Sequence, residues 1–573
     1  MANRQYNYTI SLNIVLGFLI LGLLVVIFAM ASVPPVSRDA LTHHLAVPKI
    51  WLKKGLFTEL PTIPFSYYPM NLDLLYLIPL SFGNDIVPKY IHGAFAIFTA
   101  LLIYRQLKKR LDTGFALLGA LFFLSIPVIV KLSVTVYVDL GLIFFSTAAL
   151  FALLEWMENG YRVKEILLAG FCSGLALGTK YNGLITFFLL TCFVPFLYLR
   201  KFDDKLVRKM ISTQAYAVGW MALFIIVSIV IYSPWMARNA VLTGNPFYPL
   251  YNGFFKTDRM QSNDLKIGSQ TNDTDFKLKQ KKTPWKNFAT RKLVYKERLW
   301  QIGLIPLRIF FEGEDDNPKH FDGKLSPFLL LLPLLLLVPG IGIDRQLSLE
   351  CVIYIIFSIT YLIIVFFKVD MRTRWIGPII PPMVMLSMIG LHRFQRWGVK
   401  LRSVRNVKIS KVIVGIVIGG MLVFNVNYIY ALYNKIDPLN FITGKVNRGN
   451  YIAKFRPEYE LMHFINQHLD DRASILGLFI GNRIYYCNRE IQTNVKEFKK
   501  SVNSSDSAEQ IQTNLLDAGI THILLRFELF ELWVSHDINA EKQKTLKLFF
   551  KKYAIPLKLC AGYGFFEILN HSS

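Results

Sequence analysis

Long apolar runs alternate with short polar segments over the first three quarters of the chain. A helix needs about 20 mostly apolar residues to cross a bilayer, and eleven runs come close to that length. They are residues 10–31, 86–104, 113–131, 135–156, 165–180, 182–199, 212–235, 326–343, 349–367, 375–392 and 412–432. This pattern predicts a polytopic α-helical membrane protein with about eleven transmembrane helices. A further apolar stretch, residues 72–82, is too short to span easily.

The first run ends in Ala29-Met30-Ala31, which resembles a signal-peptidase site. We interpret the run as a membrane anchor, with a cleaved leader as the alternative. The run is long for a leader, Arg4 is the only basic residue before it, and many further runs follow.

The charge pattern gives an orientation. Four lysine- and arginine-rich loops fall on one side of the membrane if each run is one crossing, and such loops favour the cytoplasm. They are residues 105–110, 162–164, 200–209 and 392–411. The N-terminus is then cytoplasmic, and a bacterial plasma membrane is favoured over the endoplasmic reticulum. The outer loops, residues 32–85 and 236–325, and the tail are then extracytoplasmic. The net charge of +25 is only partly explained by this rule, since the loop 236–325 and the tail are themselves lysine-rich. Such surfaces suit phosphates or anionic lipids, although solubility explains them equally well.

Two domains are expected: a membrane domain over residues 1–432 and an extracytoplasmic α/β domain over residues 433–573. The tail has helical patterns and strand-like segments. The helical patterns cover residues 457–469, 507–516 and 537–553, and the strand-like segments cover residues 474–479 and 521–525. Because no phosphate loop or metal spacing is present, we expect a packing or acceptor-recruiting module. Cys487 and Cys560 form either a disulfide or two separate thiols.

Two acids stand out at the predicted outer membrane surface. Asp39 is the only acid before Glu59, and it lies between the first apolar run and the pair His43 and His44. Asp139 lies near the outer end of the fourth run. A charge at the centre of a span costs roughly 2.5 to 3.5 kcal/mol, so Asp139 is expected to face protein or water. Simple exposure at the interface is the alternative.

Four cations break the inside-positive trend. They lie at outer ends of predicted spans and are Lys180, Arg238, Arg372 and Arg374. Arginine can grip a phosphate through two parallel hydrogen bonds. Snorkelling to lipid headgroups explains each cation singly. All four cations lie on the same predicted side of the membrane, however, and this favours an anionic ligand.

These residues occur in short motifs whose order resembles that of the C superfamily of membrane glycosyltransferases, the GT-C superfamily. The branch with the greatest resemblance contains the protein O-mannosyltransferases and the lipid A aminoarabinose transferase, of glycosyltransferase family 39 type. The motifs lie within residues 10–432 and are Asp39 with His43, Tyr68-Pro69, Asp139, Gly178-Thr179-Lys180-Tyr181, Pro234-Trp235-Met236-Ala237-Arg238-Asn239, Gly244-Asn245-Pro246-Phe247-Tyr248-Pro249, and Arg374-Trp375 before Pro378 and Pro381-Pro382.

The resemblance implies a GT-C fold and a polyprenyl-phosphate sugar as donor. It also implies that an acid of the first outer loop, here Asp39, acts near the acceptor, which is a lipid, glycan or protein. A base must take the acceptor proton when the anomeric carbon inverts. The expected catalytic residues are therefore Asp39, Asp139 and His43. Lys180, Arg238, Arg372 and Arg374 are expected to bind the departing phosphate, and Tyr67, Tyr68 and Trp235 to exclude water.

One departure from the family concerns the first outer loop, because relatives often carry two adjacent acids where Arg38 and Ala40 flank Asp39 here. His43 and His44 are then candidates to compensate as base or metal ligand. A divalent cation at the acidic segment 312–322 is a further alternative, although such a segment is more often a solvated loop. No metal site or other cofactor is predicted, and membrane lipids rather than nucleic acids are the expected surroundings.

Two rival functions remain from the sequence. A polyprenyl-linked lipid transporter or flippase would also be polytopic and basic, but it would be expected to show paired halves and buried mid-membrane charges. A non-catalytic assembly scaffold would leave the membrane acids replaceable. The sequence therefore favours an enzyme, a membrane glycosyltransferase, over both.

Overall fold

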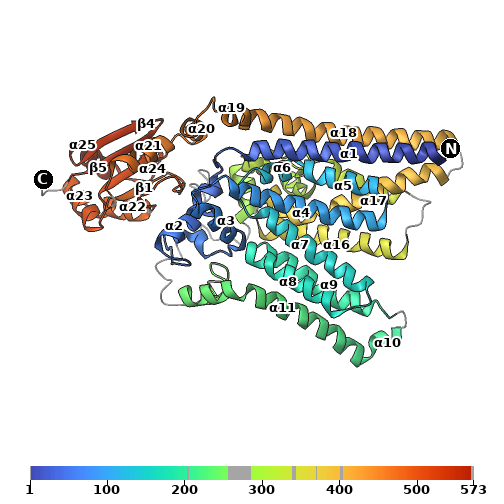
Figure 1. The fold of residues 1–573 in the computed structure, drawn as a ribbon. Coiled ribbons are helices and arrows are strands. Elements are labelled where there is room, and N and C mark those ends of the chain that lie inside the picture. Colours follow the sequence, from blue (N-terminus) through green and yellow to red (C-terminus); the bar gives the residue numbers. More distant parts are fainter. Residues whose placement is uncertain are drawn as a thin grey trace. The chain divides into compact units, whose positions relative to one another are not determined.

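Residues 2–202, 205–255, 286–338, 344–369, 371–400, 404–470, 472–493 and 495–569 are described by a computed structural model of the chain. The chain divides into two units. Unit 1 consists of Met1–Ser32, Tyr67–Leu75 and Val87–Pro438, and unit 2 consists of Val33–Ser66, Tyr76–Ile86 and Leu439–Ser573 (Figure 1). Most of the predicted first outer loop, including Asp39, therefore shares a unit with the predicted tail domain.

Unit 1 is helical, and each predicted apolar run overlaps helical structure, although residues 339–343 of the run 326–343 lie outside the described residues. Its longer helices are α1 (Ala2–Ala31), α4 (Val87–Arg110), α5 (Thr113–Ser125), α6 (Pro127–Ser133), α7 (Asp139–Glu158), α8 (Val163–Thr179), α9 (Gly183–Leu199), α11 (Ile211–Thr243), α16 (Arg345–Lys368), α17 (Ile380–Lys400) and α18 (Val404–Ile436). Shorter ones are α10 (Lys205–Lys209), α12 (Lys286–Ala289), α13 (Leu299–Gly303), α14 (Ile305–Arg308) and α15 (Phe328–Leu331). Helix α3 (Asn71–Ser81) contributes residues to both units.

Seven helices among the described residues are long and apolar enough to cross a membrane. Helices α5 and α6 would add an eighth span, but the chain bends by 67° between them. The predicted single run 113–131 is thus a broken span or a re-entrant loop. The bend occurs because Pro127 has no N–H to continue the helix and holds Ile126 in an extended conformation. Helix α9 and the segment Phe328–Leu337 are shorter than a full span, so the multi-pass class is confirmed with fewer full-length helices than runs.

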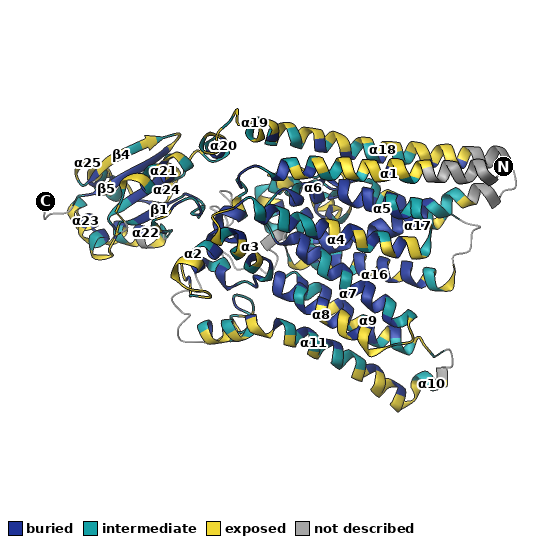
Figure 2. Ribbon diagram, in the orientation of Figure 1, coloured by how far each residue is buried: buried dark blue, intermediate teal, exposed yellow. Residues whose placement is uncertain are grey.

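The burial pattern separates inner from outer helices in unit 1. About three quarters of the apolar window of α7 is buried, against about a quarter in α1, α11 and α18 (Figure 2). The exposed faces of these outer helices carry large apolar side chains such as Phe28, Val230 and Val423, as expected for contact with lipid. Helix α8 packs closely on α11 because Gly170 and Gly174 leave no room for a Cβ beside Val227 and Ile231.

Unit 2 contains a five-stranded mixed sheet in the order β2-β1-β3-β5-β4. The strands are β1 (Ser474–Leu478), β2 (Glu490–Gln492), β3 (His522–Arg526), β4 (Ala554–Cys560) and β5 (Tyr563–Ile568). β1 pairs in parallel with β2 and β3, and β5 pairs antiparallel with β3 and β4. The helices are α2 (Ala46–Lys54), α19 (Pro438–Ile442), α20 (Arg448–Phe455), α21 (Tyr459–His468), α22 (Val495–Ser504), α23 (Ala508–Asp517), α24 (Phe527–Asp537) and α25 (Ala540–Lys552).

Side chains of the sheet alternate between two apolar cores, as the period of a strand requires. Leu476 and Leu478 of β1 pack with residues of α22, α23, α24 and α25, whereas Ile475 packs with residues of α21. The expected C-terminal α/β domain is therefore present, with helices on both faces of its sheet. Cys487 and Cys560 are free thiols, so the disulfide alternative is wrong.

Candidate functional site

Asp139 and Lys180 form a buried ion pair in unit 1. Asp139 is the first residue of α7, where the positive end of the helix dipole favours an acid. Its side chain is 1% exposed, and Lys180 Nζ lies 2.6 Å from Oδ1. Lys180 follows the last residue of α8 and is 20% exposed. Oδ2 of Asp139 is buried without a hydrogen-bond partner among the described residues. The pair thus has an enclosed acid and a cation that reaches the surface.

His92 of α4 fixes the start of α7, and sequence reasoning missed it. The backbone N–H of Leu140 donates to Nε2 of His92 at 3.0 Å. Nδ1 lies 2.9 Å from each of two carbonyl oxygens, those of Leu132 and Thr135. Since Nε2 accepts, Nδ1 must carry the proton and donate to these carbonyls. A histidine inside an apolar run was the available signal, and this one orients the helix end that carries Asp139.

The two arginines that precede α17 differ in their surroundings. Arg374 stacks over the ring of Tyr137 at 5.0 Å and lies close enough to Asp139 to attract it electrostatically. Arg372 stacks over Trp375 at 5.1 Å, and its guanidinium lies 3.2 Å from Oδ2 of Asp322. Asp322 therefore neutralises Arg372, while Asp139 attracts both Lys180 and Arg374.

Arg238 belongs to the same network through its neighbour in α11. Its guanidinium lies 6.0 Å from the ring centre of Tyr67. The amide of Asn239 donates to the backbone carbonyl of Tyr67 at 2.9 Å and lies 3.5 Å from the hydroxyl of Tyr181, which follows Lys180 in the chain. We call Lys180, Arg238 and Arg374 the cationic cluster.

The predicted aromatic residues of the substrate pocket lie on the same elements. Tyr68 meets Tyr181 edge to face at 5.2 Å between ring centres, and burial raises the pKa of its hydroxyl. Nε1 of Trp235 donates to Oδ1 of Asn71 at 2.7 Å. Gly178 makes room for this contact, because a Cβ there would lie 2.2 Å from the Asn71 side chain. The structure thus gathers aromatic rings around the segment that carries Lys180.

In unit 2, Asp39 immediately precedes a π-helical turn, Ala40–His44. Asp39 is half-buried and Arg38 is exposed, whereas His43 and His44 are buried. The His43 ring lies 4.5 Å from Phe65 and 4.0 Å from His44, and its Nδ1 lies 2.8 Å from Oγ1 of Thr42. π-Helical turns are rare and often occur at functional sites. The acid and the predicted second base thus lie on one short, unusual segment.

The acidic segment 312–322 is engaged by cations and hydrogen-bond donors of unit 1. The partners are Arg308 for Glu312, His320 and Asn317 for Glu314, Lys131 and Tyr428 for Asp315, Lys131 and Lys435 for Asp316, and Arg372 for Asp322. Among the described residues no group of three or more candidate ligands could hold a metal ion. These acids therefore join the ends of helices rather than surround an ion.

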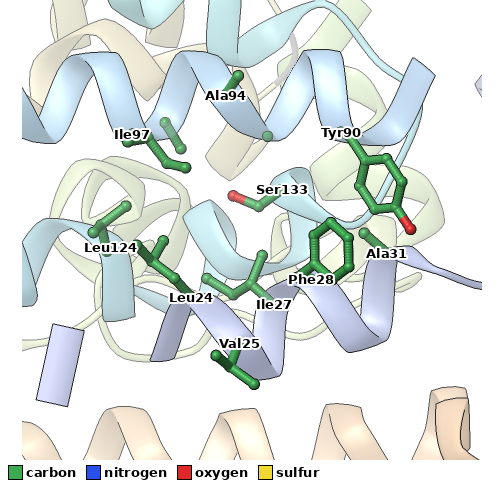
Figure 3. Close-up of a pocket in the computed structure, with 12 residues that line it drawn as sticks. Leu24, Val25, Ile27, Phe28, Ala31, Tyr90, Ala94, Ile97, Leu124 and Ser133 are labelled. Atoms are coloured by element: carbon green, nitrogen blue, oxygen red, sulfur yellow. The ribbon is translucent and has the colours of Figure 1, made fainter. Parts of the chain in front are cut away.

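A separate apolar pocket of about 340 Å³ lies between α1, α4, α5 and α6 (Figure 3). Its wall includes Leu24, Phe28, Ile97 and Leu124, and the polar groups at its edge are those of Tyr90 and Ser133. No predicted site residue lines it. Its lining suits a hydrocarbon chain and not a sugar, which would leave polar groups without partners.

The chain is similar to known membrane glycosyltransferases in sequence and in fold. Residues 89–243 match the model of the dolichyl-phosphate-mannose-protein mannosyltransferase family. This segment contains Asp139, Lys180 and Arg238. A comparison with curated protein sequences gives no match.

Among solved structures, ArnT from Cupriavidus metallidurans bound to undecaprenyl phosphate matches with a TM-score of 0.56 and 13% identity, over 97% of this chain and 98% of that one. The apo form of the same protein matches with a TM-score of 0.57 and 13% identity, over 96% of this chain and 97% of that one. The apo oligosaccharyltransferase of Archaeoglobus fulgidus matches with a TM-score of 0.52 and 11% identity, over 96% of this chain and 74% of that one. The predicted resemblance and the GT-C fold are confirmed.

Proposed function

We propose that the protein is an inverting glycosyltransferase that moves a sugar from a polyprenyl phosphate to a lipid, glycan or protein acceptor at the extracytoplasmic face of a cell membrane. The observation that carries the proposal is the gathering of basic side chains near Asp139. This one buried carboxylate attracts Lys180 and Arg374 within a network that also includes Arg238. Basic side chains gathered in this way suit a phosphate, and ArnT, which shares the fold, has been solved bound to undecaprenyl phosphate.

In this mechanism the cationic cluster binds the phosphate of the donor and stabilises it as it leaves. The bond between the anomeric carbon and the phosphate oxygen breaks, and both electrons remain on the phosphate. The acceptor hydroxyl or amine attacks the opposite face of the anomeric carbon, and Asp39 takes its proton. A lipid phosphate is a good leaving group, so it needs positive charge more than a proton.

The other site residues have supporting roles in the proposal. Asp139 holds Lys180 at the end of α8, so that the ammonium does not have to be ordered when the donor binds. Tyr67, Tyr68 and Trp235 keep water from the sugar. His43 is an alternative base on the Asp39 segment. The basic cytoplasmic loops predicted by the inside-positive rule support the orientation.

The test uses the full chain in lipid nanodiscs with undecaprenyl-phosphate mannose and undecaprenyl-phosphate aminoarabinose, and with membrane extract as a source of acceptors. We expect Asp39→Asn to lower the transfer rate about 100- to 10,000-fold, the range for loss of a positioned base, without weakening the binding of undecaprenyl phosphate. Glu59→Gln is the matched control, because Glu59 is an exposed acid of the same unit.

The result also separates the rival functions. Full transfer by Asp39→Asn would contradict the role of this carboxylate. A protein that binds undecaprenyl phosphate but moves it between leaflets without forming a glycoside would be a transporter. A scaffold would show neither activity.

A further inference from the structure

The segment around Asp39 is attached to the tail domain by directed hydrogen bonds. Residues 34–37 have no regular secondary structure, so their backbone carbonyls need donors from elsewhere. The hydroxyl of Tyr486 donates to the carbonyl of Pro35 at 2.7 Å, and Nε of Arg456 donates to that of Val36 at 2.6 Å. Both donors come from the tail.

The chain after Asp39 is held in the same way. The backbone N–H of Tyr485 donates to the carbonyl of Leu41 at 3.2 Å. Nζ of Lys49, in α2, donates to the carbonyl of Tyr485 at 2.6 Å and to Oδ1 of Asn488 at 2.9 Å. Burial, assisted by nearby Lys53, lowers the pKa of Lys49 to about 8. Lys49 is half-buried where it meets the tail.

These contacts converge on residues 482–489, which we call the clamp loop. The loop is itself fixed to α21, since Asn466 donates to the carbonyl of Tyr486 at 2.8 Å and accepts from the N–H of Asn488 at 2.7 Å. Arg489 donates to the carbonyl of Leu469 from both Nε and a terminal nitrogen. The clamp loop is thus fixed to α21 and to Leu469, which follows it.

A salt bridge adds a further attachment within unit 2. Arg448 of α20 lies 2.5 Å from Oδ2 of Asp85, which follows α3 and is 4% exposed. Lys54 at the end of α2 lies 3.2 Å from Glu490. The tail therefore contacts both the segment 33–66 and the segment 76–86, the two parts of the first outer loop that belong to unit 2.

We propose that the tail domain is a positioning device for Asp39, in which the clamp loop and Arg456 fix the backbone on both sides of this acid. The inference rests on the proposed function, because it gives Asp39 the role of base. Lys49, Arg456 and Tyr486 are then positioning residues that act through the placement of the carboxylate. Catalysis is sensitive to such placement, since a shift of about 1 Å can cost about 100-fold in rate.

The experiment compares two double variants of the full chain in nanodiscs. The clamp variant, Lys49→Met with Tyr486→Phe, removes two donors to the contact. The control variant, Lys542→Met with Gln543→Met, removes similar contacts inside the tail but none of the clamp loop, since Lys542 donates to the carbonyl of Ser505 and Gln543 donates to that of Ile538. The readouts are amide hydrogen exchange over residues 36–45, kcat, and the KM for the donor undecaprenyl-phosphate mannose or undecaprenyl-phosphate aminoarabinose, whichever the wild type uses.

We expect the clamp variant to exchange residues 36–45 at least tenfold faster and to lose about tenfold in kcat with an unchanged donor KM. The control variant should change neither the exchange rate nor kcat. Unchanged exchange, or faster exchange with unchanged kcat, would overturn the positioning role. If Asp39→Asn itself retained full transfer, the proposed function would fail instead, and the exchange rates would still show whether the tail restrains the segment.

Discussion

The cationic cluster and the acidic segment 312–322 both lie in unit 1, and both consist of charges that the sequence assigns to ligand binding. Their charge balance differs. In the acidic segment each engaged acid has a cation or a hydrogen-bond donor, which comes from within the segment for Glu314 and from other parts of unit 1 for the rest. In the cluster, one buried acid attracts two cations. The comparison indicates that the acids of the segment 312–322 connect parts of the fold, whereas basic side chains gathered near one buried acid suit an anionic ligand.

Arg372 and Arg374 show the same contrast within three residues of the chain. Both are expected from the sequence to bind the phosphate of the donor. The structure gives Arg372 the carboxylate of Asp322, while Arg374 stacks on Tyr137 beside the Asp139–Lys180 pair. Local sequence does not separate them, because Asp322 is 50 positions away in the chain.

The largest expected effect concerns the pair Lys180–Asp139. Lys180→Ala would leave Asp139, 1% exposed, without its ammonium partner. We expect a loss of about 3 kcal/mol in the free energy of unfolding, as found when one partner of a buried pair is removed. Asp139→Asn should lower the free energy of unfolding by a smaller amount, because Lys180 reaches the surface and its ammonium can be hydrated.

The measurement is denaturant unfolding in detergent for both single variants and for the double variant Lys180→Ala with Asp139→Asn. The double variant should recover much of the loss, which would show coupling between the two residues. The pair Lys131 and Asp316 of the acidic segment is the control, with an expected coupling of at most about 1 kcal/mol. Strictly additive losses for Lys180 and Asp139 would contradict a stabilising buried pair.

The second effect concerns donor binding by the arginines. Arg374→Gln and Arg238→Gln should each weaken the binding of undecaprenyl phosphate about 10- to 100-fold, the value of one hydrogen bond to a charged group. Arg372→Gln should weaken it less, because Asp322 already neutralises this guanidinium.

Isothermal titration in detergent micelles at fixed salt would give the three affinities. Salt must be fixed because it screens exposed charges. Equal losses for Arg372→Gln and Arg374→Gln would mean that charge balance does not distinguish ligand-binding cations from structural ones here.

The fold could be predicted from sequence to the extent that it depends on local patterns. Within the described residues, all eleven apolar runs overlap helical structure, because hydrophobicity along a segment is a local property. The strand-like segment 474–479 and the helical pattern in residues 507–516 likewise predicted β1 and α23, and Ser507 caps α23 by accepting from the N–H of Gln510. The bend at Pro127 was missed, although proline after an apolar segment was a usable signal.

The site was less predictable because its partners come from distant parts of the chain. The sequence placed Asp139 and Lys180 in one site, and the structure brings them into contact across 41 positions. It did not single out His92, Asn239 or Tyr137 as supporting residues, since each acts through a tertiary contact and the only signal at His92 was a histidine inside an apolar run. The metal alternative at residues 312–322 arose because ion partners such as Lys131 and Lys435 are invisible to a local pattern.

The smallest effect concerns the acidic segment and its dependence on pH. The hydrogen bond from Arg308 lowers the pKa of Glu312 below its ordinary 4.5. Partial burial of Asp316 opposes ionisation, but Lys131 and Lys435 outweigh it and lower the pKa below 3.8. A group whose pKa is lower in the folded state stabilises the fold above the unfolded pKa, and this contribution is lost as the pH falls through the folded pKa. The contribution is therefore full at pH 7 and decreases below about pH 4.5.

The double variant Glu312→Gln with Asp316→Asn should melt about 2 °C lower than the wild type at pH 7, as expected for exposed ion pairs worth about 0.2 to 1 kcal/mol each. Between pH 5 and pH 3 its melting temperature should fall less steeply, because the two titrating groups are gone. Glu531→Gln, at an exposed acid of α24 with no ion pair among the described contacts, is the control and should follow the wild type. Equal slopes for the double variant and the wild type would mean that these acids do not stabilise the fold. The acidic segment would then no longer be an example of charges that stabilise the fold, in contrast to the cationic cluster.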